Sequence, residues 1–359
     1  MPTIPTKAYG ASGSVFNSLK PMDIERTPPQ ADEVHIDILY CGVCHSDLHQ
    51  ARNDWHNTIY PCVPGHEVVG RVVEVGSAVS KFGVGDIVGV GCMIDSCGSC
   101  SSCREGEENY CEGPVGWTAT YNGYMKPANQ DFNTFGGYST AIVVREAFVL
   151  RIPAALDIKA AAPILCAGVT TYSPMKRWNV GPGQRVAVVG IGGLGHMAVK
   201  LARALGATVT AVTRTADKQA EAEKLGAHDV LISSDAKAMA AHELAFDFIL
   251  ITIPDAFDLN DYVKLARRDG VITTVGLLGP YEGPLNNQEM AMHRRSVAGS
   301  IIGGIAETQE VLEFCAEHGI APDVEMIAMQ DINEAFSKMM DQEVRFRYVI
   351  DMQSLKDEK

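Results

Sequence analysis

The chain has 359 residues, and at about 100–200 residues per domain this length predicts two domains or three. Of these residues 46% are hydrophobic and 21% are charged, as in ordinary globular proteins, and no apolar run reaches the roughly 18 residues that a transmembrane helix needs. The net charge of −14 disfavours a nucleic acid partner, and neither a basic amphipathic helix nor a signal peptide is visible, so we expect a cytoplasmic protein without membrane contact.

The first third of the chain, to about residue 155, is rich in valine and glycine. Short alternating runs predict strands at 34–39 and 68–75, and glycines punctuate the stretch that follows. This pattern predicts a compact all-β or α+β unit.

The middle of the chain alternates short apolar strands with helices. Strands are predicted at 185–189, 208–212, 229–232, 246–251, 271–275 and 296–302, and helices at 194–205, 216–225 and 259–266. Because this alternation is typical of a parallel sheet covered by helices, we predict a doubly wound α/β domain. From about residue 303 the pattern predicts further helices at 308–317 and 332–340 and a strand at 348–350.

A glycine-rich loop follows the first strand of this α/β domain and opens its first helix. Its residues fit G-x-G-x-x-G and are Gly190, Ile191, Gly192, Gly193, Leu194 and Gly195. In this context the three motif glycines provide a tight turn, close approach of the backbone to a pyrophosphate, and close helix-to-strand packing. The helix N-terminus then offers N–H groups to the phosphates, so we predict a dinucleotide site.

The next strand indicates which dinucleotide is bound. An NAD enzyme usually carries an acid about 20 residues after the loop, where it binds the ribose 2′-hydroxyl. Here the strand ends in Thr213, Arg214 and Thr215, with Lys218 shortly after, and Asp217 comes too late to take that place. Hydroxyls and cations suit a 2′-phosphate, so the sequence favours NADP.

The ten cysteines include one tight cluster. Without a signal peptide a reducing compartment is expected, where clustered cysteines bind metal more often than they form disulfides. The cluster consists of Cys97, Cys100, Cys103 and Cys111 in a loop rich in glycine and serine. Four thiolates at this spacing predict a closed, structural zinc site; the spacing and the lack of a following proline disfavour an iron–sulfur centre.

A second set of metal-binding residue types is spread along the chain. Cys44 and His66 lie 22 positions apart, and Cys166 follows a hundred positions later. Two cysteines and one histidine with an open fourth position are the ligand set of a catalytic zinc in alcohol dehydrogenase. We therefore predict a catalytic metal site next to the nucleotide loop.

At these motifs the chain resembles the zinc-dependent medium-chain alcohol dehydrogenases, in order and spacing along essentially its whole length. The segments 61–67, 165–172 and 192–198 are similar to those of the cinnamyl alcohol dehydrogenase branch, especially its bacterial NADP-dependent aldehyde reductases. The resemblance implies a GroES-like catalytic domain at 1–158 with a zinc lobe at about 92–115. It further implies a Rossmann NADP-binding domain at 159–302 and a segment 303–359 that returns to the catalytic domain.

The resemblance also implies a role for each matching residue. Cys44, His66 and Cys166 would bind the catalytic zinc, with Glu67 beside it as an alternate ligand. Asp47 would orient His66 through the other ring nitrogen. Ser46 would hydrogen-bond the substrate oxygen, and His49 would pass its proton to solvent.

Further positions carry over to the cofactor and the substrate. By resemblance, the cofactor positions are His45 near the pyrophosphate and, at the nicotinamide and its ribose, Thr252, Gly276, Ser300, Ile301 and Ile302. Candidates for an apolar substrate pocket are Trp55, Trp117 and Tyr121. A homodimer is implied as well, with the strand at 296–302 pairing with its twin at a sheet edge.

The sequence thus predicts an enzyme with two zinc ions per chain that transfers hydride between NADP(H) and a primary alcohol or aldehyde, aromatic or medium aliphatic. An NAD-dependent polyol dehydrogenase is an alternative, against which Cys166 and the missing acid argue, since many of those enzymes use Glu as third ligand. A zinc-free quinone reductase would lack Cys44 and the four-cysteine lobe. A non-catalytic zinc- and nucleotide-binding sensor would need neither Ser46 nor His49.

Overall fold

The computed structural model describes residues 3–126, 132–254, 256–276, 281–341 and 346–358. The chain forms two compact units: residues 1–166 together with 303–359, and residues 167–302. The first unit extends beyond the boundary expected after residue 158 and includes Cys166. Each unit has its own sheet.

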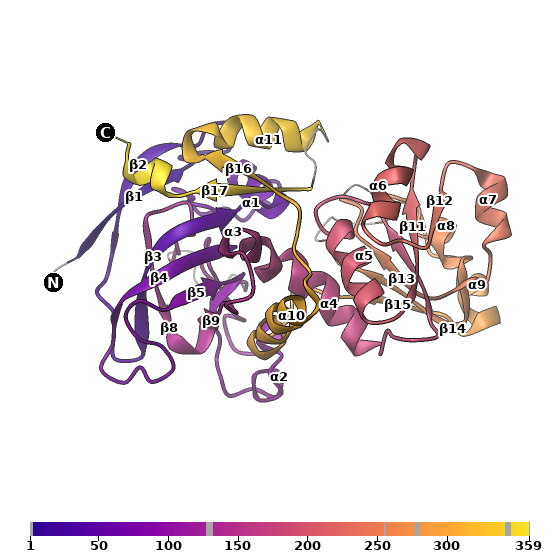
Figure 1. Ribbon diagram of the computed structural model, residues 1–359, viewed down its shortest axis with the longest axis horizontal. Helices are drawn as coiled ribbons and strands as arrows, with labels where there is room; N and C mark the ends of the chain where they lie inside the picture. The colour runs from indigo at the N-terminus through magenta and orange to yellow at the C-terminus, as the bar shows by residue number, and fades with distance from the viewer. Residues whose placement is uncertain (1–2, 127–131, 255, 277–280, 342–345, 359) are drawn as a thin grey trace. The chain divides into compact units, whose positions relative to one another are not determined.

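The first unit is built on a mostly antiparallel seven-stranded sheet (Figure 1). Its order is β16-β17-β3-β4-β5-β9, with β8 paired to β3, and only β16 and β17 run parallel to each other. The strands are β3 (Glu33–Gly42), β4 (Val68–Val75), β5 (Ile87–Val90), β8 (Ala141–Arg145), β9 (Leu150–Arg151), β16 (Val324–Ala328) and β17 (Arg347–Asp351). In β3 the side chains of Val34, Ile36 and Ile38 are fully buried, which follows from the period of two that places alternate residues on one face.

Two small sheets and several helices complete this unit. A hairpin pairs β1 (Ile4–Gly10) with β2 (Lys20–Arg26), and a second small sheet pairs β6 (Met93–Asp95) with β7 (Thr118–Ala119). The helices are α1 (His45–Arg52), α2 (Ser101–Arg104), η1 (Glu108–Tyr110), η2 (Glu146–Phe148), α3 (Ile158–Ala161), η3 (Ala162–Leu165), α10 (Ile305–His318), η5 (Met329–Asp331), α11 (Ile332–Met340) and α12 (Gln353–Lys356).

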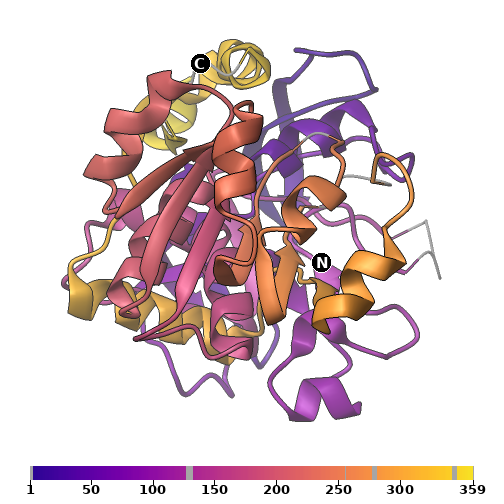
Figure 2. The same ribbon diagram turned by 90° about the vertical axis from the view of Figure 1, so that its right-hand side faces the viewer.

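The second unit is a six-stranded parallel sheet flanked by helices, as Figure 2 shows. The strand order is β12-β11-β10-β13-β14-β15, which confirms the predicted doubly wound sheet. The strands are β10 (Arg185–Val189), β11 (Thr208–Thr213), β12 (Asp229–Ile232), β13 (Phe246–Ile251), β14 (Ala266–Thr274) and β15 (Ser296–Gly299). The helices are α4 (Ala167–Arg177), α5 (Gly195–Ala204), η4 (Ala216–Lys218), α6 (Gln219–Lys224), α7 (Ala236–Ala241), α8 (Asn260–Val263) and α9 (Asn287–His293).

Some predicted bounds in this unit are wrong. The helix predicted at 259–266 ends at Val263, because β14 begins at Ala266 and extends the strand that was predicted to start at residue 271. The strand predicted at 296–302 ends at Gly299. The helices α4, α7 and α9 of this unit were not predicted, and neither was β16 of the first unit. Neither α7 nor α9 buries a residue, so neither has the apolar stripe that marks a helix in a sequence. None of the helices in the described residues is long and apolar enough to cross a membrane.

Candidate metal centres and cofactor loop

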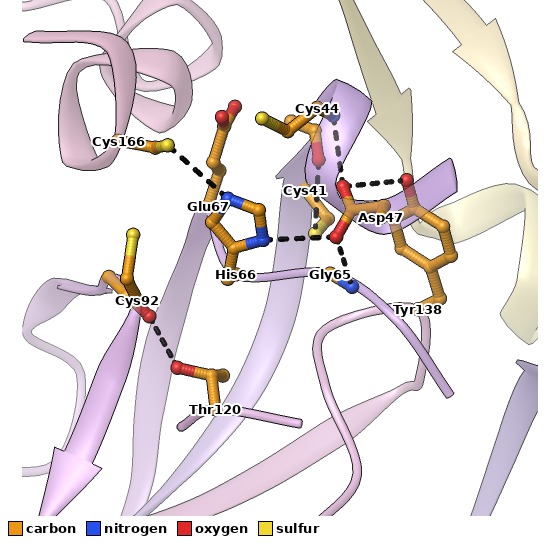
Figure 3. Close-up of polar contacts among 12 residues, drawn as sticks. Cys41, Cys44, Asp47, Gly65, His66, Glu67, Cys92, Thr120, Tyr138 and Cys166 are labelled. Atoms are coloured by element: carbon orange, nitrogen blue, oxygen red, sulfur yellow. Dashed lines mark hydrogen bonds and ion pairs between the residues drawn. The ribbon is translucent and has the colours of Figure 1, made fainter. Parts of the chain in front are cut away.

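Four side chains of types that can bind a metal converge in the first unit (Figure 3). One ligand atom from each of Cys44, His66, Glu67 and Cys166 lies within 4.8 Å of all the others, and all four residues are buried. The His66 Nε2 atom lies 3.3 Å from the Cys166 sulfur. The structure therefore brings together the three ligands expected from the sequence and the acid expected beside them.

Asp47 is fully buried and positions two residues of this cluster, His66 and Cys44, through hydrogen bonds. One of its carboxylate oxygens accepts hydrogen bonds from His66 Nδ1 and from the Gly65 backbone N–H, each at 3.0 Å. The other accepts from the Cys44 backbone N–H at 2.9 Å and from the Tyr138 hydroxyl at 3.2 Å. Since His66 donates from Nδ1, its Nε2 lone pair faces the other ligands and is free to bind a metal.

Two features of the local chain make this arrangement possible. Cys44 is the residue before α1, so Asp47 lies in the first turn of the helix and its side chain can reach back to the Cys44 N–H. Gly65 has a φ of +100°, and a Cβ there would lie 2.7 Å from the Tyr138 ring. Only glycine fits this left-handed position, and it delivers His66 to the site.

The electrostatics favour a bound cation. A hydrogen bond from Cys166, with help from His66 and Arg347, lowers the pKa of Cys44 well below its ordinary value. Burial alone would lower the pKa of His66, but the Asp47 carboxylate raises it well above its ordinary value. Two thiols, an imidazole and a carboxylate are ligands that zinc accepts, so this donor set fits the metal expected from the sequence.

Glu67 forms a buried ion pair with Arg347 of β17, a partner that the sequence did not reveal. Burial raises the pKa of Glu67 to about 7, and the Arg347 charge opposes that rise. The Glu67 Oε2 atom is buried without a hydrogen-bond partner among the described residues. A Cβ on Gly42 would overlap this oxygen, so Gly42 leaves the space that the carboxylate occupies. An unpartnered carboxylate oxygen beside three other ligands fits an alternate metal ligand.

Cys92 also lies beside the cluster, as Figure 3 shows, and sequence reasoning had given it no role. Its thiol hydrogen-bonds to Cys166 and, together with the stronger bond from Cys44, raises the pKa of Cys166 well above its ordinary value. No spacing in the sequence pointed to Cys92, because its partner Cys166 is more than seventy positions away in the chain.

The four clustered cysteines form a second candidate metal centre in the same unit. One sulfur from each of Cys97, Cys100, Cys103 and Cys111 lies within 4.8 Å of all the others. Backbone N–H groups point at these sulfurs at 3.4–3.5 Å, and those of Ser99 and Cys100 lower the pKa of Cys97 to about 6. Donors around a ring of thiols stabilise thiolates, which is the form that zinc binds.

The face of α1 carries the proposed proton path. Ser46 and His49 lie three positions apart on this helix and therefore share a face. The His49 Nδ1 atom lies 2.8 Å from an Asp54 carboxylate oxygen, a contact that the sequence analysis missed. The rings of His45 and Trp55 lie 6.2 Å and 5.8 Å from the His49 ring.

The two other aromatic residues proposed for the substrate pocket are buried in the same unit. The Tyr121 and His66 rings lie 5.6 Å apart, and burial, together with the charge of Asp47 and a hydrogen bond to it, raises the pKa of Tyr121 well above the ordinary value. Trp117 is buried next to β7. Tyr121 therefore has a polar contact with Asp47 in addition to any role in lining a pocket.

In the second unit, the glycine loop has the geometry that a pyrophosphate requires. Gly190 has a φ of +90°, which a tight left-handed turn needs. A Cβ on Gly192 would meet nothing within 4 Å, so the backbone is open to a ligand there. A Cβ on Gly195 would overlap the Gly190 carbonyl, so the helix packs against the loop as the motif predicts. The Thr252 hydroxyl donates to the Gly190 carbonyl at 2.9 Å.

The end of β11 bears the residues proposed to select the cofactor. Thr213 is buried, while Arg214 and Thr215 are exposed and Lys218 is half-buried. The Thr215 hydroxyl donates to Asp217, and this bond lowers the pKa of Asp217. Asp217, the acid that comes too late in the sequence to bind the ribose, is thus hydrogen-bonded to Thr215.

The remaining cofactor candidates lie at the carboxyl ends of β14 and β15. Gly276 follows β14 and is exposed. The Ser300 N–H donates to the Thr274 carbonyl at 3.0 Å, Ile301 is half-buried, and Ile302 is buried. These positions are at the edge of a parallel sheet where α/β proteins bind ligands.

Comparison with known proteins identifies the family. The family model of the alcohol dehydrogenase GroES-like domain matches residues 30–154, and the family model of the zinc-binding dehydrogenase matches residues 193–317. Aldehyde reductase YahK of Escherichia coli is 52% identical over 353 residues, covering 98% of this chain and 99% of its own. The chain belongs to the zinc-binding alcohol dehydrogenases. It is therefore an oxidoreductase, as the resemblance implied.

Solved structures of this alcohol dehydrogenase family agree with the fold. A cinnamyl alcohol dehydrogenase from Sorghum bicolor has a TM-score of 0.92 at 40% identity, with 99% of both chains covered. A cinnamyl alcohol dehydrogenase from Helicobacter pylori, solved in complex with NADP(H), has a TM-score of 0.89 at 39% identity, covering 98% of this chain and 99% of that one. An NADP-dependent alcohol dehydrogenase C of Mycolicibacterium smegmatis is 46% identical over 97% of this chain and 98% of its own.

Proposed function

We propose that this alcohol dehydrogenase interconverts aldehydes and primary alcohols, aromatic or medium aliphatic, with NADP(H) as hydride carrier and zinc at the Cys44–His66–Cys166 cluster. The observation that carries this proposal is the convergence of three buried ligands whose histidine is oriented by Asp47. The relatives named as aldehyde reductase and as NADP-dependent alcohol dehydrogenase support the substrate class and the cofactor.

When bound, the zinc ion would polarise the carbonyl oxygen and the nicotinamide would carry the hydride. The residues of the chain do the rest. Asp47 holds His66 in the tautomer that leaves Nε2 free to bind. Ser46 would donate a proton to the substrate oxygen during reduction. His49, which contacts Asp54 and lies one turn after Ser46 on the same helix face, would then resupply Ser46 with a proton from solvent.

The four-cysteine lobe would hold a second zinc ion with a purely structural task, since four thiolates leave no open coordination position. In this proposal the GroES-like domain carries both metals and the Rossmann domain binds NADP. The edge strand β15 would pair with its twin in a homodimer. None of the described cysteines is in a disulfide, which agrees with a cytoplasmic location.

A direct test follows the NADPH absorbance with benzaldehyde and measures the metal content of the same sample. We expect turnover with NADPH, slower turnover with NADH, and two zinc ions per chain. Tight NADPH binding without turnover of any aldehyde would favour a sensor. Full activity with a single zinc ion would contradict the assignment of two sites.

Cofactor choice should depend on the two cations after β11. Changing Arg214 and Lys218 together to glutamine should weaken NADPH binding about tenfold to a hundredfold, since each charge-assisted contact contributes roughly 1.5–3 kcal/mol and both side chains are partly exposed. NADH binding should change little. Fluorescence titration with both cofactors measures this, with Lys224→Gln, an exposed lysine farther along α6, as a control. Equal losses for the two cofactors would contradict the 2′-phosphate contact.

The proton path should show itself in the pH dependence of alcohol oxidation. His49→Gln should lower the rate about tenfold or more near pH 7, the low end for positioned acid–base groups because water can substitute. The loss should shrink at alkaline pH, where hydroxide takes the proton. Ser46→Ala should lower the rate further than His49→Gln does, because the Ser46 hydroxyl would contact the substrate itself. A His49 variant whose pH–rate profile matches the parent at every pH would exclude His49 from the path.

A further inference from the structure

A half-buried arginine at the end of β2 donates to a single short segment of the chain. Burial of its charged group lowers the pKa of Arg26 to about 10, and no carboxylate among the described residues pairs with it. Its side-chain hydrogen bonds run instead to the segment 136–141. Because a charge buried without a counter-ion must be stabilised by its hydrogen bonds, Arg26 and this segment are held together.

The guanidinium holds the segment at three points. Its Nε atom donates to the Ala141 carbonyl at 3.1 Å, and Nη2 donates to the Gly136 carbonyl at 3.2 Å and to the Ser139 hydroxyl at 3.0 Å. Ser139 is fully buried, and its hydroxyl oxygen lies 2.7 Å from the Gly136 carbonyl and 3.1 Å from the Ala141 carbonyl. The planar fork of one arginine thus joins the two ends of a bend.

The same segment fixes the chain that leads into the metal cluster. The backbone N–H groups of 136–138 donate to the three carbonyls of 63–65 at 2.7–2.9 Å. A Cβ on Gly136 would lie 2.4 Å from the Gly65 carbonyl oxygen, so the two stretches of backbone are in direct contact. Gly65 directly precedes His66 (Figure 3). The segment therefore sets the backbone from which His66 reaches the other ligands.

We propose that Arg26 is a positioning residue for the metal centre: by fixing the segment 136–141 it holds the backbone of 63–65 and so directs the imidazole of His66 toward the metal. This inference rests on the proposed function, since the direction of His66 matters only if the cluster binds a metal. The effect is separate from the hydrogen bond between His66 and Asp47, because it acts on the backbone before the histidine. Every residue involved belongs to the first unit.

The physical argument is one of competing conformations. Without the guanidinium, the bend loses three hydrogen bonds, and its two glycines, Gly136 and Gly137, allow it many other conformations. The fraction of molecules with His66 in the binding direction then falls, and the apparent affinity for zinc falls by the same fraction. Since Asp47 still holds the imidazole ring, the loss should be smaller than the loss of Asp47 itself would cause.

The test measures the zinc dissociation constant of the Cys44–His66–Cys166 cluster by competition with a chelator, with the zinc of the four-cysteine lobe as an internal reference. Arg26→Met should weaken zinc binding about threefold to tenfold, below the roughly tenfold to hundredfold effect of a group that bonds the histidine ring directly. The affinity of the reference site should not change.

Two further arginine variants sharpen this measurement. Arg26→Lys keeps the charge but replaces the fork with a single nitrogen, so it should lose nearly as much affinity, and it carries the test if Arg26→Met fails to fold. Arg151→Met is the matched control. It removes a guanidinium of the same unit that donates to the Lys81 carbonyl at 2.9 Å, and it should bind zinc as the parent does.

Cobalt(II) in place of zinc separates positioning from general loosening, because its absorption bands depend on the geometry of its ligands. At saturating cobalt the bands of Arg26→Met should be shifted from those of the parent. Val34→Ala truncates a fully buried side chain of β3, so it should lower stability and leave the bands in place.

Parent-like zinc affinity in Arg26→Met or Arg26→Lys would overturn the proposal, and so would an equal loss of affinity with the same band shift in Val34→Ala. A parent protein that takes up zinc only in the four-cysteine lobe would instead overturn the proposed function.

Discussion

Replacing Cys166 by serine should reduce aldehyde reduction by about a thousandfold or more, because a Lewis acid contributes several kcal/mol to the reaction. The fold should survive, since serine differs from cysteine by one atom and the surrounding contacts of η3 remain. The zinc content, measured by metal analysis, should fall from two ions per chain to one. NADPH binding, measured separately, should be nearly unchanged, because Cys166 is not among the residues proposed to bind the cofactor.

The matched change in the other centre should give the opposite pattern. Cys100→Ser also removes one thiol ligand, but from the cluster whose metal would only hold the lobe. A structural zinc contributes folding free energy, so we expect the melting temperature to fall by about 10 °C or more. If Cys166→Ser lowers stability as much as Cys100→Ser does, or leaves activity intact, the division of roles between the two clusters is wrong.

Asp47→Asn should weaken zinc binding at the Cys44–His66–Cys166 cluster by about tenfold to a hundredfold, the usual cost of losing the group that orients a ligating histidine. The Asp47 carboxylate accepts four hydrogen bonds whose distances are given above, and burial leaves no water to replace it. An amide would turn its NH2 group toward at least one of these donors. Each unsatisfied buried group costs about 1–3 kcal/mol, so stability should fall as well.

Competition with a chelator measures the first effect and thermal unfolding the second. Tyr138→Phe serves as the control, because it removes one donor to Asp47 and leaves the bond to His66 in place. It should cost about 1 kcal/mol of stability and little zinc affinity. Equal zinc affinity in Asp47→Asn and the parent would show that His66 is oriented by something else.

The sequence predicted those parts of the site whose signal is local. The four clustered cysteines and the glycine loop are short motifs, and the structure brings their atoms together as their spacing implied. Strands such as β10 and β13 were predicted at their observed bounds because short runs rich in apolar residues mark buried strands. The short helices α7 and α9 bury no residue and so left no periodic pattern.

Most of the contacts that the sequence did not predict join residues far apart in the chain. Arg347 pairs with Glu67 across 280 positions, and Glu108 caps a helix that begins 197 positions later. No pattern within a window of a few residues contains such a pair. The contact between His49 and Asp54 is local, but the two residues lie five positions apart, from α1 to the turn that follows it, and neither periodicity nor a known motif links them.

The order of segments in the first unit has a consequence for how the enzyme is made. Strand β17 lies inside the sheet between β16 and β3, and it delivers Arg347 to the buried Glu67. The ribosome therefore releases nearly the whole chain before this sheet can close, whereas the second unit, residues 167–302, is complete earlier. Domains fold as units during synthesis, so the nucleotide-binding half can fold first, and the metal-binding half must wait with its thiols and its unpaired Glu67 exposed to solvent.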